Sequence, residues 1–236
     1  MTDSETAAFE RWRAKYGETL SPFWNTGLMS PEEWRGASQS TLNAFFTSPE
    51  LARAMWDIVE RMGFKGGRVL EPSAGAGVFL GTMPTHLARN SEISCVELEP
   101  LTGQLLTLLY PDANVQITGF EEAKKIENNT FDLVISNFPF GDYNVFDPKY
   151  KNISNQSIHN YFFSRSLEAL RPGGIIVALT SHHTMDAPTS SGIRKNWEKQ
   201  ADFIGAIRLP KTAHKESGTE VVTDIVILKK EKWFRA

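Results

Sequence analysis

The strongest constraint on the fold is an alternation of short apolar runs with segments of helical periodicity, which starts at residue 68 and continues almost to the C-terminus. Strands are predicted at 68–71, 93–97, 113–118, 131–136, 175–180, 203–207 and 222–228. Helices are predicted at 78–89 and 101–110, and near 157–170 and 190–200. Strands that alternate with helices in this way form a mostly parallel sheet with helices on both faces. The sequence therefore predicts an α/β fold of about seven strands, in which ligands bind beyond the carboxyl ends of the strands.

The composition is that of one globular domain. The chain has 236 residues, of which 41% are hydrophobic and 22% are charged, so it can bury a sizeable core. Its single cysteine, Cys95, excludes an intrachain disulfide and any multi-cysteine zinc site, and no metal site is expected. The longest wholly aliphatic run, at 175–179, is far shorter than the ~20 residues of a membrane-spanning helix. The N-terminus lacks the basic and apolar regions of a signal peptide, so we expect a cytoplasmic protein without membrane association.

Residues 1–40 differ in character from the rest of the chain. They contain three of the six tryptophans, scattered among turn signals, and they predict a short helix near 4–16 followed by irregular chain. We interpret this segment as an N-terminal flap and residues 41–230 as a single domain. That domain opens with a helix that is capped by Ser48 and begins at Pro49.

Charge is distributed unevenly, although the net charge is only −3. Residues 1–136 hold 11 Lys and Arg against 18 Asp and Glu, whereas residues 137–236 hold 14 against 10. The basic residues concentrate at 187–215, which contains Arg194, Lys195, Lys199, Arg208, Lys211 and Lys215. Such an asymmetry indicates a polyanionic partner for one face of the molecule. The alternative is a solvated helix and loop that happen to be basic.

A glycine-containing loop at 71–80 joins the first predicted strand to the following helix. Gly75 and Gly77 permit a tight turn and the close approach of a ligand that a side chain would block. Glu97 ends the second strand, where an acid can accept hydrogen bonds from both hydroxyls of a ribose. These features together predict a site for an adenosine-containing cofactor. The alternative is a structural turn with a solvent-exposed glutamate.

The loop departs from the dinucleotide-binding fingerprint, because Leu80 occupies the third glycine position and the strand ends in Glu71. A carboxylate at this point would repel a pyrophosphate. It suits a ligand that carries an ammonium or sulfonium charge. Glu71 therefore favours S-adenosylmethionine, with S-adenosylhomocysteine as the product, over NAD, and it argues against a dehydrogenase.

The fourth predicted strand leads into Asn-Phe-Pro-Phe at 137–140, beside the cofactor loop. This segment resembles the Asn-Pro-Pro-Tyr/Phe motif of the amino-group methyltransferases that modify adenine N6 in DNA. The 71–80 loop resembles their cofactor loop, and Phe-Phe-Thr-Ser-Pro at 45–49 is similar to the Phe-x-Thr-Pro element that gamma-ordered members place before it. The resemblance extends over about 41–230 and is strongest to the adenine-methylase domains of plasmid, phage and conjugative-element proteins, which are often joined to helicases.

The resemblance implies a Rossmann-like class I S-adenosylmethionine-dependent methyltransferase fold, and a protein encoded by a bacterium, phage or plasmid. It implies that the cofactor is bound by Phe46, Thr47, Glu71, Ser73, Ala74, Gly75, Gly77, Glu97, Phe120 and Asn137. It assigns catalysis to Asn137, Phe138, Pro139 and Phe140.

The chemistry explains the residue types of the catalytic loop. The exocyclic amine of a purine is a poor nucleophile because its lone pair is conjugated into the ring. Two acceptors against its hydrogens, the Asn137 side-chain oxygen and the Phe138 carbonyl, would move the nitrogen toward tetrahedral geometry and free that lone pair. Pro139 helps to fix the direction of the carbonyl, and Phe140 can stack on a base that has been flipped out of the duplex. The site thus works chiefly by orienting two bound groups; the alternative is a turn with two buried rings.

The chain departs from the family pattern at several positions. Phe138 replaces the first proline of the motif, which keeps the carbonyl but is expected to loosen the loop. Gly119 stands where many members carry an acid that binds the cofactor adenine. Either Glu121 substitutes for that acid, or the affinity for the cofactor is weak. His214 stands where relatives often have an aromatic residue near the flipped base; it can stack there, or it is an exposed loop histidine. The histidine pair at 182–183 has no acid or cysteine partner in the sequence and receives no role.

Only residues 229–236 follow the last predicted strand, whereas gamma-ordered DNA methylases usually carry a separate target-recognition domain there. We therefore expect no such domain. Sequence selectivity is then either weak or supplied by a partner subunit or a fused helicase. Affinity would come from contacts to phosphates. The residues expected to bind DNA are Phe140, Arg194, Lys195, Lys211, His214 and Lys215, with Lys149 and Lys151 as further candidates.

The leading interpretation is an adenine-specific N6 DNA methyltransferase of the restriction-modification type. Two alternatives stay open. Similar loops act on RNA bases and on a glutamine amide in proteins, so the acceptor can differ. A non-catalytic, nucleic-acid-binding subunit with the cofactor fold is the other alternative, and it is motivated by Phe138 and Gly119.

Overall fold

The computed structural model describes residues 47–211, 213 and 221–231. The predicted flap at 1–40 and the site candidates Phe46, His214 and Lys215 lie outside the described residues. None of the helices in the described part of the chain combines the length and the apolar character that crossing a bilayer requires.

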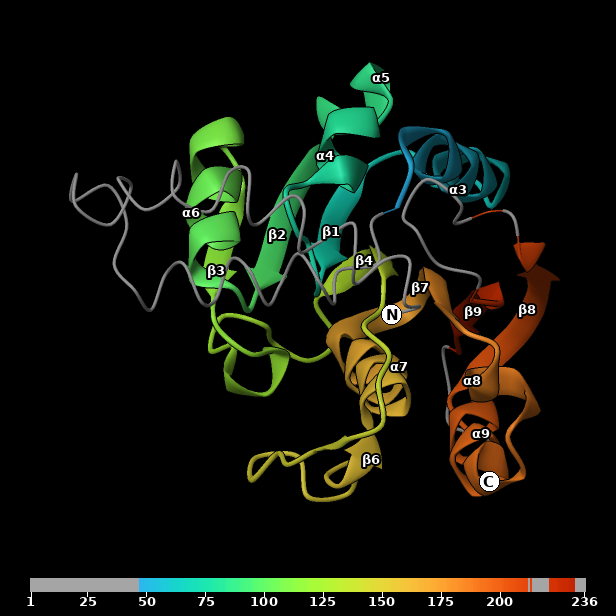
Figure 1. Ribbon diagram of the computed structural model, residues 1–236. Coiled ribbons are helices and arrows are strands. Elements are labelled where there is room, and N and C mark those ends of the chain that lie inside the picture. Colours follow the sequence, from blue (N-terminus) through green and yellow to red (C-terminus); the bar gives the residue numbers. More distant parts are fainter. Residues whose placement is uncertain (1–46, 212, 214–220, 232–236) are drawn as a thin grey trace, which may run out of the picture. The chain divides into compact units, whose positions relative to one another are not determined.

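The centre of the molecule is a seven-stranded sheet (Figure 1). Its strands are β1 (Gly67–Glu71), β2 (Ser91–Glu97), β3 (Asn114–Ile117), β4 (Phe131–Asn137), β7 (Leu170–Ser181), β8 (Ala201–Arg208) and β9 (Thr223–Lys230). They lie in the order β3-β2-β1-β4-β7-β9-β8. Strand β9 is antiparallel to both of its neighbours, whereas the other adjacent pairs are parallel. The predicted sheet, mostly parallel and of about seven strands, is confirmed.

Helices cover both faces of this sheet, as predicted (Figure 1). One face packs against α3 (Pro49–Arg61), α4 (Val78–Thr82), α5 (Thr85–Ala88) and α6 (Pro100–Leu109). The other face packs against α7 (Ile158–Ala169) and α9 (Ser191–Glu198). Successive side chains of a strand point to opposite faces. In β4, Leu133 and Ile135 therefore join the α3 cluster, and Val134 joins the α7 cluster.

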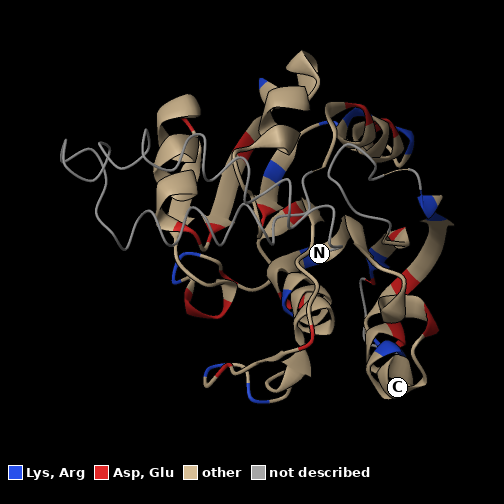
Figure 2. Cartoon of the chain, viewed as in Figure 1, with Lys and Arg blue, Asp and Glu red and all other residues tan. Residues whose placement is uncertain are grey.

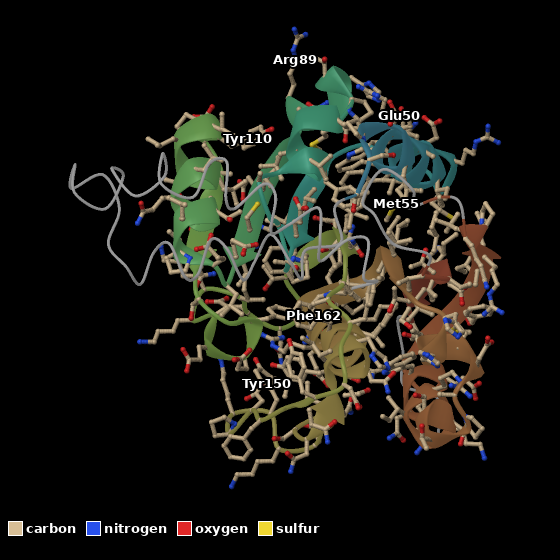
Figure 3. The ribbon with its side chains drawn as sticks, in the orientation of Figure 1. Glu50, Met55, Arg89, Tyr110, Tyr150 and Phe162 are labelled. Atoms are coloured by element: carbon tan, nitrogen blue, oxygen red, sulfur yellow. The ribbon has the colours of Figure 1, made fainter. Side chains whose placement is uncertain are left out.

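Helix α3 begins where the sequence predicts it. The Ser48 hydroxyl oxygen accepts a hydrogen bond from the Leu51 N–H at 3.2 Å, and Pro49 occupies the first helical position. Met55, labelled in Figure 3, is buried on the face that packs on the sheet. The Trp56 indole donates to the Phe79 carbonyl at 2.9 Å. That bond ties α3 to α4, the helix that follows the cofactor loop.

The single helix predicted at 78–89 was wrong, because the chain forms α4 and α5 instead. Helix α4 ends at Thr82, Met83 is extended with ψ 130°, and α5 begins at Thr85. Pro84 explains the break, since proline has no N–H to donate and it disfavours the helical conformation of the residue before it.

A two-stranded antiparallel ladder follows β4 and was not predicted. It pairs β5 (Asn144–Val145) with β6 (Gln156–Ser157), directly before α7. Strands of two residues are too short to show a periodicity in the sequence. The remaining short elements are η1 (Phe120–Glu122), α8 (His183–Asp186) and η2 (Pro188–Ser190).

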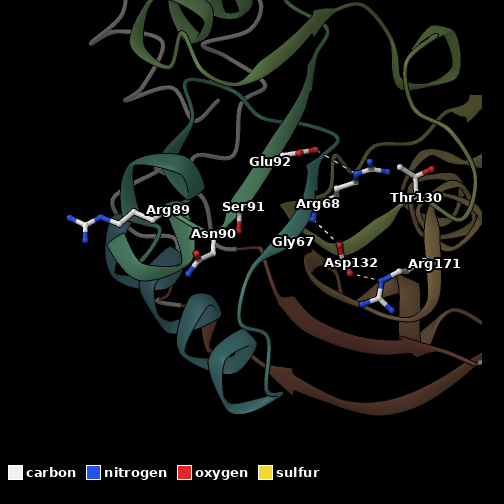
Figure 4. A pocket seen from close by; sticks show the side chains of 9 residues that line it. All are labelled: Gly67, Arg68, Arg89, Asn90, Ser91, Glu92, Thr130, Asp132 and Arg171. Carbon is white, nitrogen blue, oxygen red and sulfur yellow. Dashed lines mark hydrogen bonds and ion pairs between the residues drawn. The ribbon is translucent and has the colours of Figure 1, made fainter.

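An open cleft of about 510 Å³ lies at the amino ends of the strands (Figure 4). Its lining comprises Gly67, Arg68, Arg89, Asn90, Ser91, Glu92, Thr130, Asp132 and Arg171. Asp132 accepts a hydrogen bond from the Arg68 N–H at 2.8 Å and pairs with Arg171. Most charged side chains of the cleft are therefore paired with one another. The cleft lies at the edge of the sheet opposite to the predicted ligand site.

Candidate active site

The two loops predicted to carry the chemistry lie side by side. Strands β1 and β4 are parallel neighbours, with Leu70 opposite Val134, so their carboxyl ends meet at one edge of the sheet. The Ser136 hydroxyl donates a hydrogen bond to the Ser73 carbonyl at 3.4 Å. The cofactor loop and the end of β4 are therefore in direct contact.

Backbone hydrogen bonds fix the cofactor loop against β2. The Ala74 N–H donates to the Val96 carbonyl at 3.0 Å, and the Gly75 N–H donates to a Glu97 carboxylate oxygen at 2.7 Å. The Gly77 N–H turns back to the Ala74 carbonyl at 2.9 Å. The loop is thus held at its centre by the residue that ends β2.

The two glycines of the loop have different structural roles. Gly75 has φ +53°, and a Cβ built on it would meet no atom within 4 Å. Gly77 has φ +84°, and a Cβ there would fall 2.5 Å from the Tyr110 ring and 2.7 Å from Leu106. Gly77 therefore allows α6 to pack against the loop, with Tyr110 labelled in Figure 3, and Gly75 leaves open space in which a ligand can approach the backbone.

Glu97 lies where an acid can receive a ribose. One of its oxygens accepts from Gly75 N–H and the other from Glu99 N–H at 2.8 Å. Burial raises the pKa of Glu97, and these backbone hydrogen bonds oppose the rise. Each carboxylate oxygen has a second lone pair, so ribose hydroxyls can add to the bonds already made. The next residue, Leu98, is 70% exposed and offers an apolar surface beside this acid.

Glu71 is not the solvent-exposed glutamate of the structural alternative, because only 1% of it is exposed. Burial, and secondarily the charge of Glu97, raise the pKa of its carboxyl well above the usual value. Its Oε2 atom has no hydrogen-bond partner among the described residues. An unsatisfied buried carboxyl fits a site that receives a cation, so the donor set of this loop suits S-adenosylmethionine.

The catalytic loop is anchored rather than loosened by Phe138, contrary to expectation. Its N–H donates to the Leu179 carbonyl at 2.9 Å, a bond that proline could not make. Its side chain is fully buried, with the ring centroid 4.8 Å from that of Phe163 and 5.6 Å from that of Phe162. Asn137, the last residue of β4, pairs with Leu179 of β7. The loop therefore leaves the sheet with its backbone fixed on the β7 side.

Phe120 lies in the core, and its predicted contact with the cofactor adenine is not supported. Its ring is buried, with centroids 5.1 Å from Phe162 and 6.2 Å from Tyr161 of α7. A ring enclosed in this way has no free face on which a base could stack. The Glu121 side chain folds back onto Gly119, and a Cβ at residue 119 would collide with its carboxylate. The structure thus brings an acid to the place left vacant by Gly119.

The basic residues at 187–215 are only in part available to a polyanion. Arg194 donates from one guanidinium nitrogen to the Thr184 and Ala187 carbonyls, at 3.0 and 3.1 Å, so this nitrogen braces α8 and η2, and a role of Arg194 in DNA binding stays a prediction. Arg208 is paired with Asp224 and Asp186. The exposed basic side chains of this segment among the described residues are Lys195, Lys199, Arg208 and Lys211, of which Arg208 is the one paired with carboxylates.

The structure also brings together three histidines near the carboxyl end of β7. The rings of His182 and His183 lie 4.0 Å apart, and the His182 Nδ1 atom is 3.1 Å from the Val222 carbonyl. His159, at the start of α7, has its pKa lowered by burial and by the charge of His183. The sequence could not predict that these three histidines lie close together, because α7 and β7 bring them to the same edge of the sheet only when the chain folds. No metal-binding group of three His, Cys, Asp or Glu side chains occurs among the described residues.

The family model described as Eco57I restriction-modification methylase matches residues 76–206. This match spans more than half of the chain. It includes Gly77, Glu97 and the whole catalytic loop, and it begins after Glu71 and Gly75 of the cofactor loop.

Individual proteins are similar over a comparable length. The Defense against restriction protein B of Escherichia phage P1 is 30% identical over 199 residues, which are 83% of this chain and 9% of that protein. The rRNA N(6)-adenosine-methyltransferase metl-5 of Caenorhabditis elegans is 26% identical over 206 residues, 80% of this chain and 88% of that protein. The methyltransferase subunit of a type I restriction-modification system from Streptococcus thermophilus has a TM-score of 0.66 and 18% identity, over 78% of this chain and 44% of that one.

This chain therefore spans less than a tenth of the phage protein that it matches, and less than half of the Streptococcus subunit. The structural likeness identifies the fold as that of class I S-adenosylmethionine-dependent methyltransferases. With the family match over residues 76–206, which include the catalytic loop, the chain belongs to the Eco57I restriction-modification methylase family.

Proposed function

We propose that this protein transfers the methyl group of S-adenosylmethionine to the N6 amino group of adenine in DNA. The observation that carries the proposal is the contact between the cofactor loop and the end of β4, through the Ser136 to Ser73 hydrogen bond. Because of this contact, a donor at the glycine turn and an acceptor at Asn137 would lie on one edge of the sheet. A methyl transfer requires only that two bound groups be oriented toward each other.

The donor side is formed by the cofactor loop and the end of β2. When bound, S-adenosylmethionine supplies a methyl group on an electrophilic sulfonium. Glu97 would accept the ribose hydroxyls, Gly75 would allow close approach to the backbone, and Leu98 would cover one face of the adenine. Glu71 would supply negative charge beneath the cationic end of the ligand. Glu121, folded onto Gly119, is the acid that would bind the cofactor adenine.

The acceptor side is formed by the loop after β4. Asn137 and the Phe138 carbonyl would accept hydrogen bonds from the two amine hydrogens of a flipped adenine, which frees the nitrogen lone pair. The buried ring and the N–H of Phe138 hold this carbonyl in place. Phe140 would stack on the base and offset part of the unstacking free energy of a few kcal/mol.

DNA is the preferred acceptor because the family is one of restriction-modification methylases and the phage relative is named for defense against restriction. RNA is the second candidate, supported by the similarity to an rRNA adenosine methyltransferase over 80% of this chain. Type I modification subunits are among the structurally similar proteins. This similarity supports a partner, or a further part of a longer protein, that supplies target recognition; a fused helicase is one form this could take.

The test is methyl transfer from isotope-labelled S-adenosylmethionine to duplex DNA, single-stranded DNA, RNA and protein, followed by chromatography of the nucleosides. We expect label in N6-methyldeoxyadenosine, and its loss in Asn137→Ala. Asn114→Ala, an exposed asparagine at the start of β3, is the matched control and should retain activity. Label in DNA that survives Asn137→Ala would contradict the assignment of the catalytic loop. Label in RNA alone would favour the second candidate, and cofactor binding without any transfer would favour a non-catalytic subunit.

A further inference from the structure

An arm of the chain, residues 142–157, separates the catalytic loop from α7. It starts directly after Gly141, carries β5 and β6, and appears below α7 in Figure 1. The ladder pairs Asn144 with Ser157, and the Ile158 N–H donates to the Tyr143 carbonyl at 3.0 Å. Both ends of the arm are therefore fixed next to the place where the acceptor base would lie.

A buried aspartate holds the middle of the arm in one conformation. Asp147 is fully buried, and one of its oxygens accepts hydrogen bonds from the N–H groups of Lys149 at 2.8 Å and Tyr150 at 3.0 Å. Its other oxygen accepts from the Tyr161 hydroxyl at 2.6 Å, and its own N–H donates to the Ser154 hydroxyl at 2.9 Å. These bonds satisfy both carboxylate oxygens and define the turn.

An arginine of α7 fixes the arm to the core. The Arg165 guanidinium lies 4.1 Å from the centre of the Tyr150 ring, and the Tyr150 hydroxyl donates to Asn128 at 2.8 Å. Arg165 also donates to the Ile126 carbonyl at 2.6 Å. Figure 3 labels Tyr150, which lies below Phe162 of α7 in that view. Stacking of a buried guanidinium on an aromatic ring stabilises such a contact.

The outer side of this rigid arm carries aromatic and basic side chains. Phe146 is 67% exposed and Tyr143 is 56% exposed. Lys149 and Lys151 are also exposed, and neither forms an ion pair with a carboxylate in the described part of the chain. In Figure 2, basic residues mark the loop beside β6. The Lys149 ammonium lies 5.2 Å from the centre of the Tyr150 ring. Packing within the domain accounts for the inner side of the arm but not for the exposed parts of these four side chains.

Tyr143 also lies against the catalytic loop. A Cβ on Gly141 would fall 2.9 Å from the Tyr143 ring, so the absence of a side chain at residue 141 lets the ring reach this position. Burial, and secondarily the charge of Glu121, raise the pKa of its hydroxyl. Tyr143 is thus placed between the proposed acceptor pocket and the outer part of the arm.

We propose that the arm binds the unpaired stretch of the DNA strand next to the target adenine, with Tyr143 and Phe146 stacking on bases and Lys149 and Lys151 contacting phosphates. Aromatic rings combined with basic side chains are the usual means of holding a single strand, because every base has a face for stacking and every nucleotide carries a phosphate. Enzymes that modify a base either flip it out of the duplex or act on a single-stranded substrate, and the arm would serve the second case by holding the strand beside the target adenine. The inference rests on the proposed function, since it takes DNA as the acceptor, and it adds a strand-binding site that the catalytic loop does not provide.

The test is fluorescence anisotropy of the full chain with a labelled single-stranded oligonucleotide and with the corresponding perfect duplex. We expect Phe146→Ala and Tyr143→Ala each to weaken binding of the single strand about tenfold, a typical loss for one stacked base, with little change for the duplex. The double variant K149Q/K151Q should reduce the dependence of binding on salt, because two phosphate contacts are lost. Phe203→Ala, an aromatic residue 52% exposed on β8, and Lys65→Gln, an exposed lysine near the amino end of the sheet, are the matched controls.

Wild-type affinity in the three arm variants would overturn the inference, as would an equal loss for single strand and duplex. Tighter binding of an RNA strand of the same sequence would overturn DNA as the ligand. The outcome is separable from the proposed function, because Asn137→Ala should abolish transfer, whereas binding of a single strand without adenine should still depend on the arm. If the arm variants bind normally while Asn137→Ala loses transfer, only this inference fails. If strand binding depends on the arm but no methyl transfer occurs, only the proposed function fails.

Discussion

The hydroxyl of Ser136 donates a hydrogen bond to the carbonyl of Ser73 at 3.4 Å, across 63 residues of sequence. Ser73 belongs to the cofactor loop, and Ser136 precedes the asparagine of the catalytic loop. The contact exists because β1 and β4 are parallel neighbours whose carboxyl ends share one edge of the sheet. A donor and an acceptor can therefore be held against each other without any movement of the two strands.

Phe138 should be as important for stability as for catalysis. We expect Phe138→Ala to lower the free energy of unfolding by about 3–5 kcal/mol, because it removes a fully buried ring. Phe138→Pro should also destabilise the protein, since it removes the N–H that donates to Leu179 as well as the ring. Denaturant unfolding measures both, and Phe146→Ala, at an exposed position, is the control. Equal unfolding curves for Phe138→Ala and the wild type would contradict the anchoring role.

The two glycines of the cofactor loop should respond differently to alanine. Gly77→Ala places a Cβ against Tyr110 and Leu106 at a positive φ, so we expect a loss of more than about 2 kcal/mol in unfolding free energy. Gly75→Ala meets open space, so we expect a loss of only about 1–2 kcal/mol, from its backbone conformation alone. Its Cβ would instead enter the ligand space and weaken binding of S-adenosylmethionine at least tenfold. Calorimetric titration and denaturation together separate the two effects.

The buried carboxyl of Glu71 should make stability depend on pH. Its pKa in the folded chain is raised above the ordinary 4.5, mainly by burial, so the folded state binds more protons than the unfolded state above that pH. Stability in the absence of ligand should therefore fall as pH rises from about 4.5 through the folded pKa. Glu71→Gln should remove this part of the dependence and raise stability at neutral pH. Thermal unfolding across pH 4 to 8 measures it.

The same substitution should weaken cofactor binding, by roughly tenfold or more, because a charge-assisted interaction is lost. If Glu71→Gln is more stable than the wild type but binds S-adenosylmethionine more weakly, Glu71 contributes to cofactor binding at a cost in stability. Unchanged affinity in Glu71→Gln would contradict that role.

Arg194 and Lys195 are adjacent but should behave differently. Arg194→Gln removes two hydrogen bonds to the carbonyls of Thr184 and Ala187, so we expect a loss of about 1–3 kcal/mol in unfolding free energy. Lys195 is exposed, and Lys195→Gln should leave stability unchanged. If Lys195 contacts a phosphate, Lys195→Gln should reduce the salt dependence of DNA binding by the equivalent of about one released counterion. A loss of stability in Lys195→Gln and none in Arg194→Gln would contradict the structural role of Arg194.

Several features of the site could be predicted from local sequence. The strand at 68–71, the glycine loop and the start of a helix at residue 78 are indicated by periodicity and by glycines that must adopt positive φ. The parallel arrangement then requires the carboxyl ends of β1, β2 and β4 to share an edge. Glu97 lies against Gly75 as a consequence. Positions of this kind depend on backbone geometry, which short segments of sequence largely determine.

Other features depended on side chains that meet only in the folded chain. Phe120 was predicted to face the cofactor and is instead buried against Phe162, because α7 packs over it. Phe138 was expected to loosen its loop, and the carbonyl of Leu179 and the rings of α7 hold it instead. The arm at 142–157 has almost no periodicity, and its conformation comes from hydrogen bonds that converge on Asp147.

The sequence by itself determined the alternation of strands and helices, the glycine turn and the positions of the acid and amide at strand ends, because each follows from backbone preferences over a few residues. The tertiary structure decided which side chains are exposed. It enclosed Glu71 and Phe138, matched Arg194 and Arg208 with acceptors, and left Tyr143 and Phe146 on the surface. Exposure depends on packing between segments far apart in the chain, and no local pattern specifies it.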